Sequence, residues 1–331
     1  MTPVGTGAVV VDCLLGENDE RSLADDVLDG LTRPLKELPP KHFYDARGAE
    51  LFDRICALPE YYPTRAERAI LHQRAEEIVL RTGAAELVEL GSGTAAKTRL
   101  LLQAMARAGS LQRYVPLDVT ESMVRETAEQ LVRELPGLCV HGIVGDFERH
   151  LAHVPAPGDG PRIVALLGGT IGNFPPGSRR RLLRAIARLL RPGRDHLLLG
   201  TDLVKDPAVI EAAYDDPPGV TADFNRNLLE VVNRELDADF EPAAFEHVAF
   251  YDREREWVEM RLRASRRMRV RVRALGLAVD FGAREEMRTE ISAKFSPQRL
   301  RDDLAAAGLE LEALLTDPED LFALSLSARP G

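Results

Sequence analysis

Polar side chains follow three apolar runs that the sequence pattern predicts to be strands. Gly91 and Gly93 follow one run, Asp118 ends the next, and Asp146 follows the third. Glycine lets the backbone turn tightly and approach a ligand, and a carboxylate can accept hydrogen bonds from both hydroxyls of a ribose. Beside Asp146, Phe147 offers a flat ring on which an adenine can stack, and the carboxylate can accept a hydrogen bond from the adenine amino group. These segments together indicate a nucleoside-containing cofactor.

Each of these residues also has an ordinary structural interpretation, and a second cofactor class fits the glycines. A strand-end Asp is commonly a helix cap, and a lone Phe commonly belongs to the core. Gly91, Gly93 and Ala96 also satisfy the G-x-G-x-x-G/A pattern, so a nicotinamide-dependent dehydrogenase is an alternative. Asp118 follows Gly91 by 27 residues, beyond the dinucleotide spacing of about 20. Asp146 and the segment next to it also disfavour the dehydrogenase.

Short apolar runs alternate with amphipathic helices over the middle of the chain. This alternation predicts an α/β fold with a parallel, doubly wound sheet, whose carboxyl edge would carry the polar residues. The turn 190–193 resembles the turn before the fifth strand of class I methyltransferases, which supports a Rossmann-like sheet of that class. We predict strands at 87–90, 114–117, 140–144, 163–167 and 196–199 and helices at 65–80 and 180–190.

The pattern changes after Asp202 and returns near Phe295. Residues 203–245 predict helices, and the following segment alternates apolar with charged residues, which predicts strands with one solvated face. The arginines of that face are expected to be solvated rather than to bind nucleic acid. A helix at 297–307 and strands at 309–315 and 321–326 would complete the interrupted sheet. We therefore predict one domain from 66–202 and 295–331, and an α+β second domain from 20–65 and 203–294.

Composition excludes several classes of protein. A net charge of −10 argues against a general nucleic-acid binder. Three widely spaced cysteines without a C-x-x-C pair indicate neither a zinc site nor a disulfide framework, which favours a reducing cytoplasm. No apolar run approaches the roughly 20 residues that span a bilayer, and the apolar segment 8–15 lacks the preceding basic residue of a signal peptide. We expect a monomer, because no coiled-coil heptad is visible.

Longer motifs make the resemblance specific. From about residue 38 to 328 the chain resembles the histidine Nα-methyltransferases of ergothioneine biosynthesis, which use S-adenosylmethionine to make trimethylhistidine (hercynine). The motifs that carry this resemblance lie at 39–45, 58–65, 89–98, 169–173, 199–206, 213–216, 224–227, 245–248 and 289–295. The chain departs from the family pattern at Gly169, Ala293 and Leu315, none of which is a matched contact.

The resemblance implies a role for each matching position. The first predicted domain would bind S-adenosylmethionine and the second would bind the substrate, L-histidine. The cofactor contacts matched are Gly91, Lys97, Asp118, Asp146 and Phe147, and the histidine contacts matched are Tyr61, Asn173, Tyr214, Glu290 and Ser292. By resemblance, Asn173 and Tyr214 hold the substrate carboxylate, Glu290 and Ser292 bind the imidazole, and Tyr44 lies near the amine.

The residue chemistry of one pair agrees independently with the resemblance. Glu290 and Ser292 are two apart in a segment predicted to be extended, so both side chains point the same way. A neutral imidazole has one donor and one acceptor nitrogen, which a carboxylate and a hydroxyl complement. An indole has no acceptor nitrogen, so Glu290 disfavours the alternative of a methyltransferase acting on a tryptophan derivative. A non-catalytic cofactor-binding scaffold is disfavoured by polar residues on every strand edge.

Methyl transfer from a sulfonium to an amine is an in-line displacement by a neutral nitrogen. We expect catalysis from positioning and electrostatics, with no metal and no covalent intermediate. Tyr44 is the candidate for orienting the amine, and the sequence identifies no obligatory general base.

Overall fold

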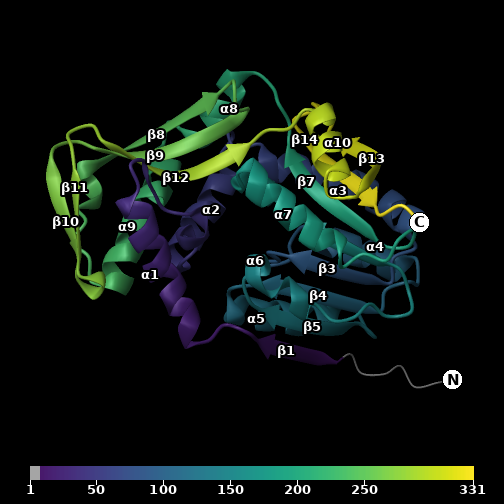
Figure 1. The fold of residues 1–331 in the computed structure, drawn as a ribbon. Helices are drawn as coiled ribbons and strands as arrows, with labels where there is room; N and C mark the ends of the chain where they lie inside the picture. The colour runs from purple at the N-terminus through teal and green to yellow at the C-terminus, as the bar shows by residue number, and fades with distance from the viewer. Residues whose placement is uncertain (1–7) are drawn as a thin grey trace. The chain divides into compact units, whose positions relative to one another are not determined.

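The computed structural model describes residues 8–331, with only the backbone for 17–22, and the chain divides into two compact units (Figure 1). The sheet unit contains the chain up to Gly16, Ala66–Leu203 and Phe295–Gly331. The second unit contains Glu17–Arg65 and Val204–Lys294. No helix in the described part of the chain is long and apolar enough to cross a membrane.

The sheet unit is built on eight strands in the order β1-β5-β4-β3-β6-β7-β14-β13. The first six are parallel to one another, whereas β14 runs antiparallel between β7 and β13. The predicted Rossmann-like sheet closed by two C-terminal strands is confirmed. The strands are β1 (Val9–Cys13), β3 (Glu86–Leu90), β4 (Arg113–Asp118), β5 (Cys139–Val144), β6 (Arg162–Leu166), β7 (His196–Asp202), β13 (Glu310–Thr316) and β14 (Phe322–Ala328).

One strand of this sheet was not predicted from the sequence. β1 pairs in parallel with β5, so that Val9 lies opposite Val140, and it lengthens the sheet at one edge. Val9 and Val10 remain exposed there, because β1 is an edge strand. Its apolar residues alone could not show which strand they would join.

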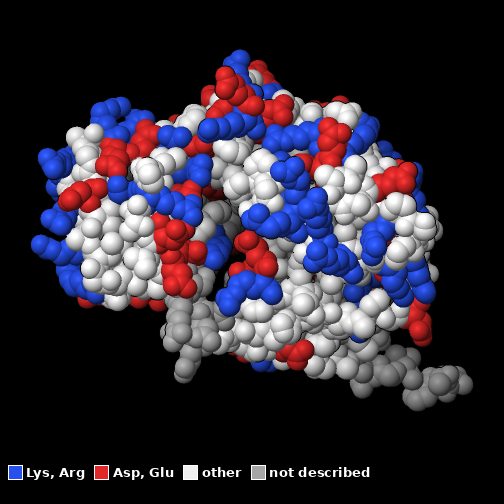
Figure 2. All heavy atoms as spheres, viewed as in Figure 1, with Lys and Arg blue, Asp and Glu red and all other residues white. Residues whose placement is uncertain are grey.

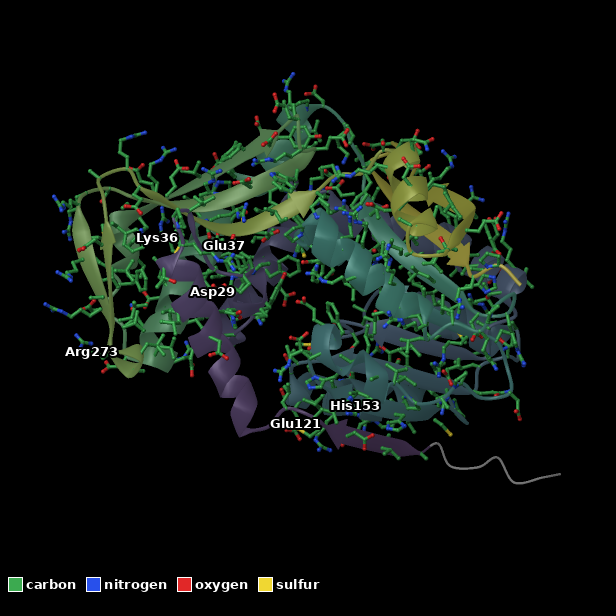
Figure 3. All side chains as sticks on the ribbon, viewed as in Figure 1. Asp29, Lys36, Glu37, Glu121, His153 and Arg273 are labelled. Atoms are coloured by element: carbon green, nitrogen blue, oxygen red, sulfur yellow. The ribbon has the colours of Figure 1, made fainter. Side chains whose placement is uncertain are left out.

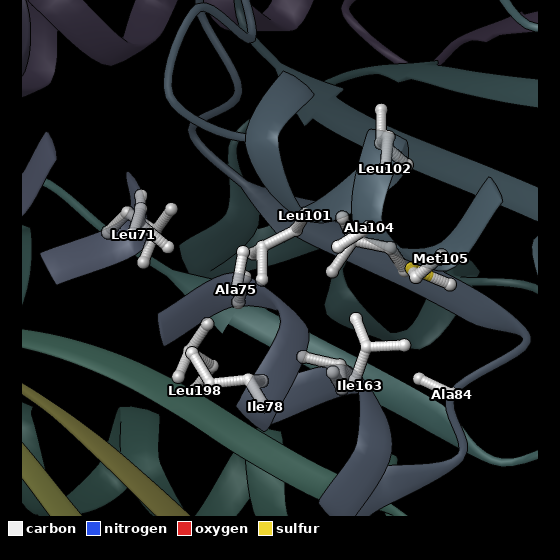
Figure 4. Close-up of a cluster of buried hydrophobic side chains, with 14 of the residues drawn as sticks. Leu71, Ala75, Ile78, Ala84, Leu101, Leu102, Ala104, Met105, Ile163 and Leu198 are labelled. Atoms are coloured by element: carbon white, nitrogen blue, oxygen red, sulfur yellow. The ribbon is translucent and has the colours of Figure 1, made fainter. Parts of the chain in front are cut away.

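Helices of the sheet unit bury their apolar faces against the strands. Figure 4 shows side chains of α3 and α4, among them Ile78 and Leu101, packed with Ile163 of β6 and Leu198 of β7. Burial of such side chains is the main contribution to stability. The helices are α3 (Pro63–Thr82), α4 (Arg99–Arg107), α5 (Glu121–Glu134), α6 (Phe147–His150), α7 (Pro176–Ala187) and α10 (Pro297–Ala305), with short 3₁₀ turns η2 (Leu151–His153) and η3 (Thr170–Asn173).

The second unit combines a four-stranded sheet, a hairpin and helices. The sheet has the order β2-β12-β9-β8, and β10 pairs with β11 in the hairpin. Its strands are β2 (Lys36–Glu37), β8 (Phe245–Asp252), β9 (Trp257–Ala264), β10 (Met268–Val272), β11 (Leu277–Phe281) and β12 (Glu286–Ala293). Its helical segments are α1 (Glu17–Thr32), η1 (Pro40–Phe43), α2 (Ala46–Ala57), α8 (Pro207–Tyr214), α9 (Val220–Leu236), η4 (Pro242–Ala244) and η5 (Arg273–Leu275).

Two helices of the second unit begin at an aspartate that caps the first turn. Asp45 accepts a hydrogen bond from the Gly48 amide at the start of α2, and Asp206 accepts one from Ala208 at the start of α8. These carboxylates satisfy amides that have no partner within the helix. Two ion pairs also hold β2 in place. Lys36 pairs with Glu285, and Glu37 pairs with Arg288. Figure 3 labels Lys36 and Glu37.

The prediction of a solvated charged face holds for β9 only in part, and it fails at Glu259. Glu259 is fully buried, because the side chains of its neighbours Arg261, Arg288 and Trp257 lie over its carboxylate, whereas Arg261 itself stays partly exposed. Its carboxylate accepts hydrogen bonds from Arg261 at 2.8 Å and from the Trp257 indole at 3.1 Å. A buried carboxylate needs such partners to offset its loss of hydration.

For β10 the same prediction is confirmed. Arg269, Arg271 and Arg273 are exposed, whereas Val270 and Val272 between them are buried. Figure 2 shows Lys and Arg side chains gathered over the β10–β11 hairpin. Carboxylates pair with several of them, including Asp237 with Arg273 and Asp280 with Arg269. This mixture of charges is typical of a solvated surface.

Candidate functional site

The glycine turn after β3 is held to the end of β4. Gly91 and Gly93 have φ angles of 72° and 50°, in the left-handed region that favours glycine. The Gly91 amide donates to the Leu117 carbonyl at 2.8 Å, and the Gly93 amide donates to Asp118 Oδ2 at 2.8 Å. The turn is therefore fixed by the carboxylate that the sequence assigned to a ribose.

Both predicted carboxylates also make local hydrogen bonds. Asp118 Oδ1 accepts from the Thr120 amide at 3.0 Å, and Asp146 Oδ1 accepts from the Glu148 amide at 2.8 Å, where it caps α6. An ionised carboxylate has about four acceptor positions, so each residue retains positions for ligand hydroxyl or amino groups. Capping and ligand binding are thus compatible at both positions.

The space beside Gly91 suits a flat nucleoside. A Cβ placed on Gly91 would lie 3.7 Å from Cε1 of Phe147, so the absence of a side chain leaves one edge of that ring open. Phe174 packs against Phe147 with ring centroids 6.3 Å apart. The ring is thereby held beside the strand ends that carry Asp118 and Asp146. These residues fit a cofactor with an adenine and a ribose.

The structure adds a residue that sequence reasoning missed, Glu67 of α3. Its side chain is fully buried, forms an ion pair with Lys97 and accepts a hydrogen bond from the Gly168 amide at 2.8 Å. A Cβ on Gly200 would lie 2.3 Å from Glu67 Oε1, so a larger residue there would displace the Glu67 carboxylate. Lys97, the candidate for the methionine carboxylate, is thus held by a buried acid. No spacing in the sequence connects Glu67 to the glycine turn.

Glu89, in the strand that leads to the glycine turn, is also buried. The Thr98 and Tyr114 hydroxyls both donate to its carboxylate. Burial nevertheless raises the pKa of Glu89 to about 7, because the ionised form loses its hydration. The protonated acid is therefore favoured in the folded protein more than in the unfolded chain.

We expect Glu89 to make stability depend on pH. Because the pKa of Glu89 is raised in the folded protein, its contribution to the free energy of unfolding is fully present below about pH 4.5. That contribution is lost as the pH rises towards about 7. Between pH 4.5 and 8 the wild type should lose on the order of 3 kcal/mol relative to Glu89→Gln, which cannot ionise. Urea unfolding followed by circular dichroism measures this difference. A difference that stays constant with pH would contradict the assignment.

In the second unit, Tyr214 and Ser292 lie in direct contact. The Tyr214 hydroxyl at the end of α8 donates to Ser292 Oγ of β12 at 2.8 Å, and both side chains are buried. Lys294, which the sequence analysis did not single out, donates to both oxygens. Lys294 follows Ser292 by two residues, as Ser292 follows Glu290, so all three belong to one face of an extended segment. This spacing is the signal from which the sequence could have indicated Lys294.

Glu290 lies on the same strand as Ser292, partly buried. Burial raises the pKa of Glu290 to about 7, and the Lys294 charge opposes that rise. No residue in the described chain forms a hydrogen bond or ion pair with its carboxylate. A half-buried carboxylate without a protein partner is a strong candidate for ligand binding.

Aromatic rings connect the remaining candidates of the second unit. Phe52 lies 5.5 Å from Tyr44 and 6.1 Å from Tyr61, and Tyr61 lies 6.3 Å from Tyr214, measured between ring centroids. Burial, followed by the charges of neighbours that include Tyr214 and Glu290, raises the pKa of Tyr61 well above its usual range. The phenol therefore stays neutral and can donate a hydrogen bond. Tyr44 is 46% exposed.

The structure brings four of the five predicted histidine contacts and Tyr44 into one unit. The fifth, Asn173, belongs to the sheet unit, where it ends the turn η3 after β6. All five predicted cofactor contacts lie in the sheet unit, at or after the ends of the adjacent strands β3, β4 and β5. The roles of these residues remain predictions.

The sheet unit is a Rossmann-like α/β fold, with glycines and carboxylates on the carboxyl edge of its parallel strands, where such sheets bind ligands. The chain belongs to the family of histidine-specific, S-adenosylmethionine-dependent methyltransferases, whose model matches residues 23–329.

Individual relatives agree with this family. The chain is 54% identical to a histidine N-alpha-methyltransferase of Mycobacterium tuberculosis, over 95% of this chain and 98% of the relative. It is 51% identical to a protein of the same name from Mycolicibacterium smegmatis, over 96% of this chain and 98% of the relative. Ergothioneine biosynthesis protein 1 of Neurospora crassa is 34% identical over 60% of this chain, which covers 23% of that longer protein.

Proposed function

We propose that this protein transfers methyl groups from S-adenosylmethionine to the α-amino group of L-histidine and gives hercynine, the first step of ergothioneine biosynthesis. The observation that carries the proposal is that Glu290 and Ser292 stand two residues apart on β12, where they offer an acceptor and a hydroxyl to an imidazole. The high identity to the two mycobacterial histidine N-alpha-methyltransferases supports the same substrate.

The cofactor supplies an electrophilic methyl group on a sulfonium. For that group, Gly91 and Phe147 would accommodate the adenosine, Asp118 and Asp146 would accept from its ribose and adenine, and Lys97 would meet its carboxylate. For histidine, Asn173 is proposed to hold the carboxylate, rather than Tyr214 as the resemblance implies, because Tyr214 donates its only hydrogen to Ser292. Tyr61 contributes a neutral phenol. Positioning of the amine is then the main source of rate acceleration.

Mass spectrometry of histidine after incubation with the enzyme and S-adenosylmethionine tests the proposal. A product with three added methyl groups on the α-nitrogen is expected. A tryptophan derivative supplied in the same assay should remain unchanged, since an indole offers Ser292 no acceptor nitrogen. Methylation of that compound but not of histidine would contradict the proposed substrate.

Tyr44 is proposed to orient the amine between successive methylations. Edge-on contacts with Phe52 and Phe224 hold the ring of Tyr44, and its hydroxyl is the polar group that would meet the amine. We expect Tyr44→Phe to accumulate mono- or dimethylhistidine, because a less well aligned amine reacts more slowly, so that the partly methylated product dissociates before the next transfer. Mass spectra at partial conversion measure the product distribution. A distribution identical to that of the wild type would remove this role from Tyr44.

We further propose, from composition and pattern alone, that the protein acts as a monomer in the cytoplasm and needs no metal.

A further inference from the structure

A buried lysine lies against the two hydroxyls of the proposed histidine site. Lys294 has no exposed surface, and its Nζ donates to Tyr214 Oη at 2.9 Å and to Ser292 Oγ at 3.0 Å. The same ammonium lies 4.5 Å from the centroid of the Tyr214 ring. Burying a lysine is costly, so its place beside ligand-binding candidates requires a reason.

The hydrogen bonds to Ser292 determine what this hydroxyl can still do. A serine hydroxyl has one hydrogen to donate and two lone pairs to accept with. Ser292 Oγ accepts from Tyr214 at 2.8 Å and from Lys294 at 3.0 Å, which uses both lone pairs. Its own hydrogen meets no acceptor among the described residues. Towards a ligand, Ser292 is therefore a donor only.

We propose that Lys294 is a positioning residue that determines ring specificity, because it keeps Ser292 as a donor to the unprotonated nitrogen of a neutral imidazole. An ammonium has donors and no acceptor, so it cannot reverse its hydrogen bond to Ser292. The inference rests on the proposed function, since it names the form of the histidine ring that the site selects.

The neighbouring carboxylate completes the recognition. Glu290, two residues before Ser292 on β12, presents acceptor oxygens to the ring nitrogen that carries the hydrogen. The Lys294 charge favours the ionised form of this carboxylate, against the effect of burial, which raises its pKa to about 7. An imidazolium has two donors and an indole has one donor only, so both leave the Ser292 hydrogen without an acceptor. A neutral imidazole satisfies both groups.

A double-mutant cycle tests the coupling between Lys294 and Ser292. Histidine affinity is measured by calorimetry, with S-adenosylhomocysteine present, for Lys294→Met, Ser292→Ala and the double variant. At about pH 9, where Glu290 with its pKa of about 7 is ionised, we expect Lys294→Met to weaken histidine binding about tenfold in the wild type and less than about twofold when Ser292 is already alanine. The same factor in both backgrounds would overturn the proposal.

Lys205 provides a matched control in the same unit. Its Nζ donates to Tyr62 at 2.8 Å and lies 4.4 Å from the ring centroid, the same contact of a lysine with a tyrosine. Lys205→Met should leave histidine affinity unchanged. If Lys205→Met weakens histidine binding as much as Lys294→Met does, the loss of any such lysine has the same effect. That result would contradict a specific role of Lys294. Lys294→Arg keeps a cation with donors only and should recover part of the affinity.

An NMR measurement on the wild-type protein tests the inference without requiring that any variant folds. The ¹⁵N NMR shifts of ring-labelled histidine bound to the wild type report whether each nitrogen carries a hydrogen. One protonated and one accepting nitrogen are expected, and a bound imidazolium would overturn the inference. A wild type that binds S-adenosylhomocysteine but not histidine would contradict the proposed function and this inference together, whereas an additive cycle in a histidine-binding protein contradicts the inference alone.

Discussion

Replacing Glu290 with alanine should weaken histidine binding by about 100-fold and leave S-adenosylhomocysteine binding within about twofold. The substitution removes the acceptor for the ring N–H, which would then be buried without a partner. The fold should tolerate it, because burial raises the pKa of Glu290 to about 7 and the ionised carboxylate is held at a cost. Near pH 8 the variant should therefore be no less stable than the wild type.

Calorimetry on both ligands measures the expected selectivity. Glu286→Ala on the same strand is the matched control: its carboxylate pairs with Arg261 and Arg263, so it should affect stability rather than histidine affinity. Equal losses of both ligands in Glu290→Ala would show that the residue supports the fold and not the imidazole. An unchanged histidine affinity would remove Glu290 from the site.

Replacing Asp118 with alanine should weaken cofactor binding by about 100-fold. Two effects add: the ribose loses its acceptor, and the Gly93 and Thr120 amides lose the oxygens to which they donate. The glycine turn would then no longer be tethered to β4. Asp118→Asn retains one acceptor oxygen and should show an intermediate loss.

Titration with two ligands separates these effects from general damage. Adenosine carries the ribose without the methionine part, so its affinity should fall by the same factor as that of S-adenosylhomocysteine. Circular dichroism checks that the sheet is intact. If S-adenosylhomocysteine still binds Asp118→Ala with the wild-type affinity, the ribose has another acceptor and the assignment is wrong.

The sequence determined the features that depend on short-range periodicity. Apolar runs predicted every strand of the sheet unit except β1, including the two strands near the C-terminus that complete it, and apolar stripes predicted the helices α3, α7 and α10. Glycines after β3 and carboxylates after β4 and β5 must meet, because neighbouring parallel strands end at one edge. The spacing of Glu290 and Ser292 likewise placed both on one face of a strand. Local backbone geometry fixes all of these relations.

Only the tertiary structure decided which residues surround those side chains. Glu67 meets Lys97 because α3 packs on the sheet, and Glu259 is buried under the side chains that pair with it. Neither fact follows from the periodicity of the sequence. The contact between Tyr214 and Lys294 joins residues 80 positions apart. Burial and charge pairing depend on the packing of whole elements, so the lysine behind Ser292 and the raised pKa of Glu290 emerge only from the folded chain.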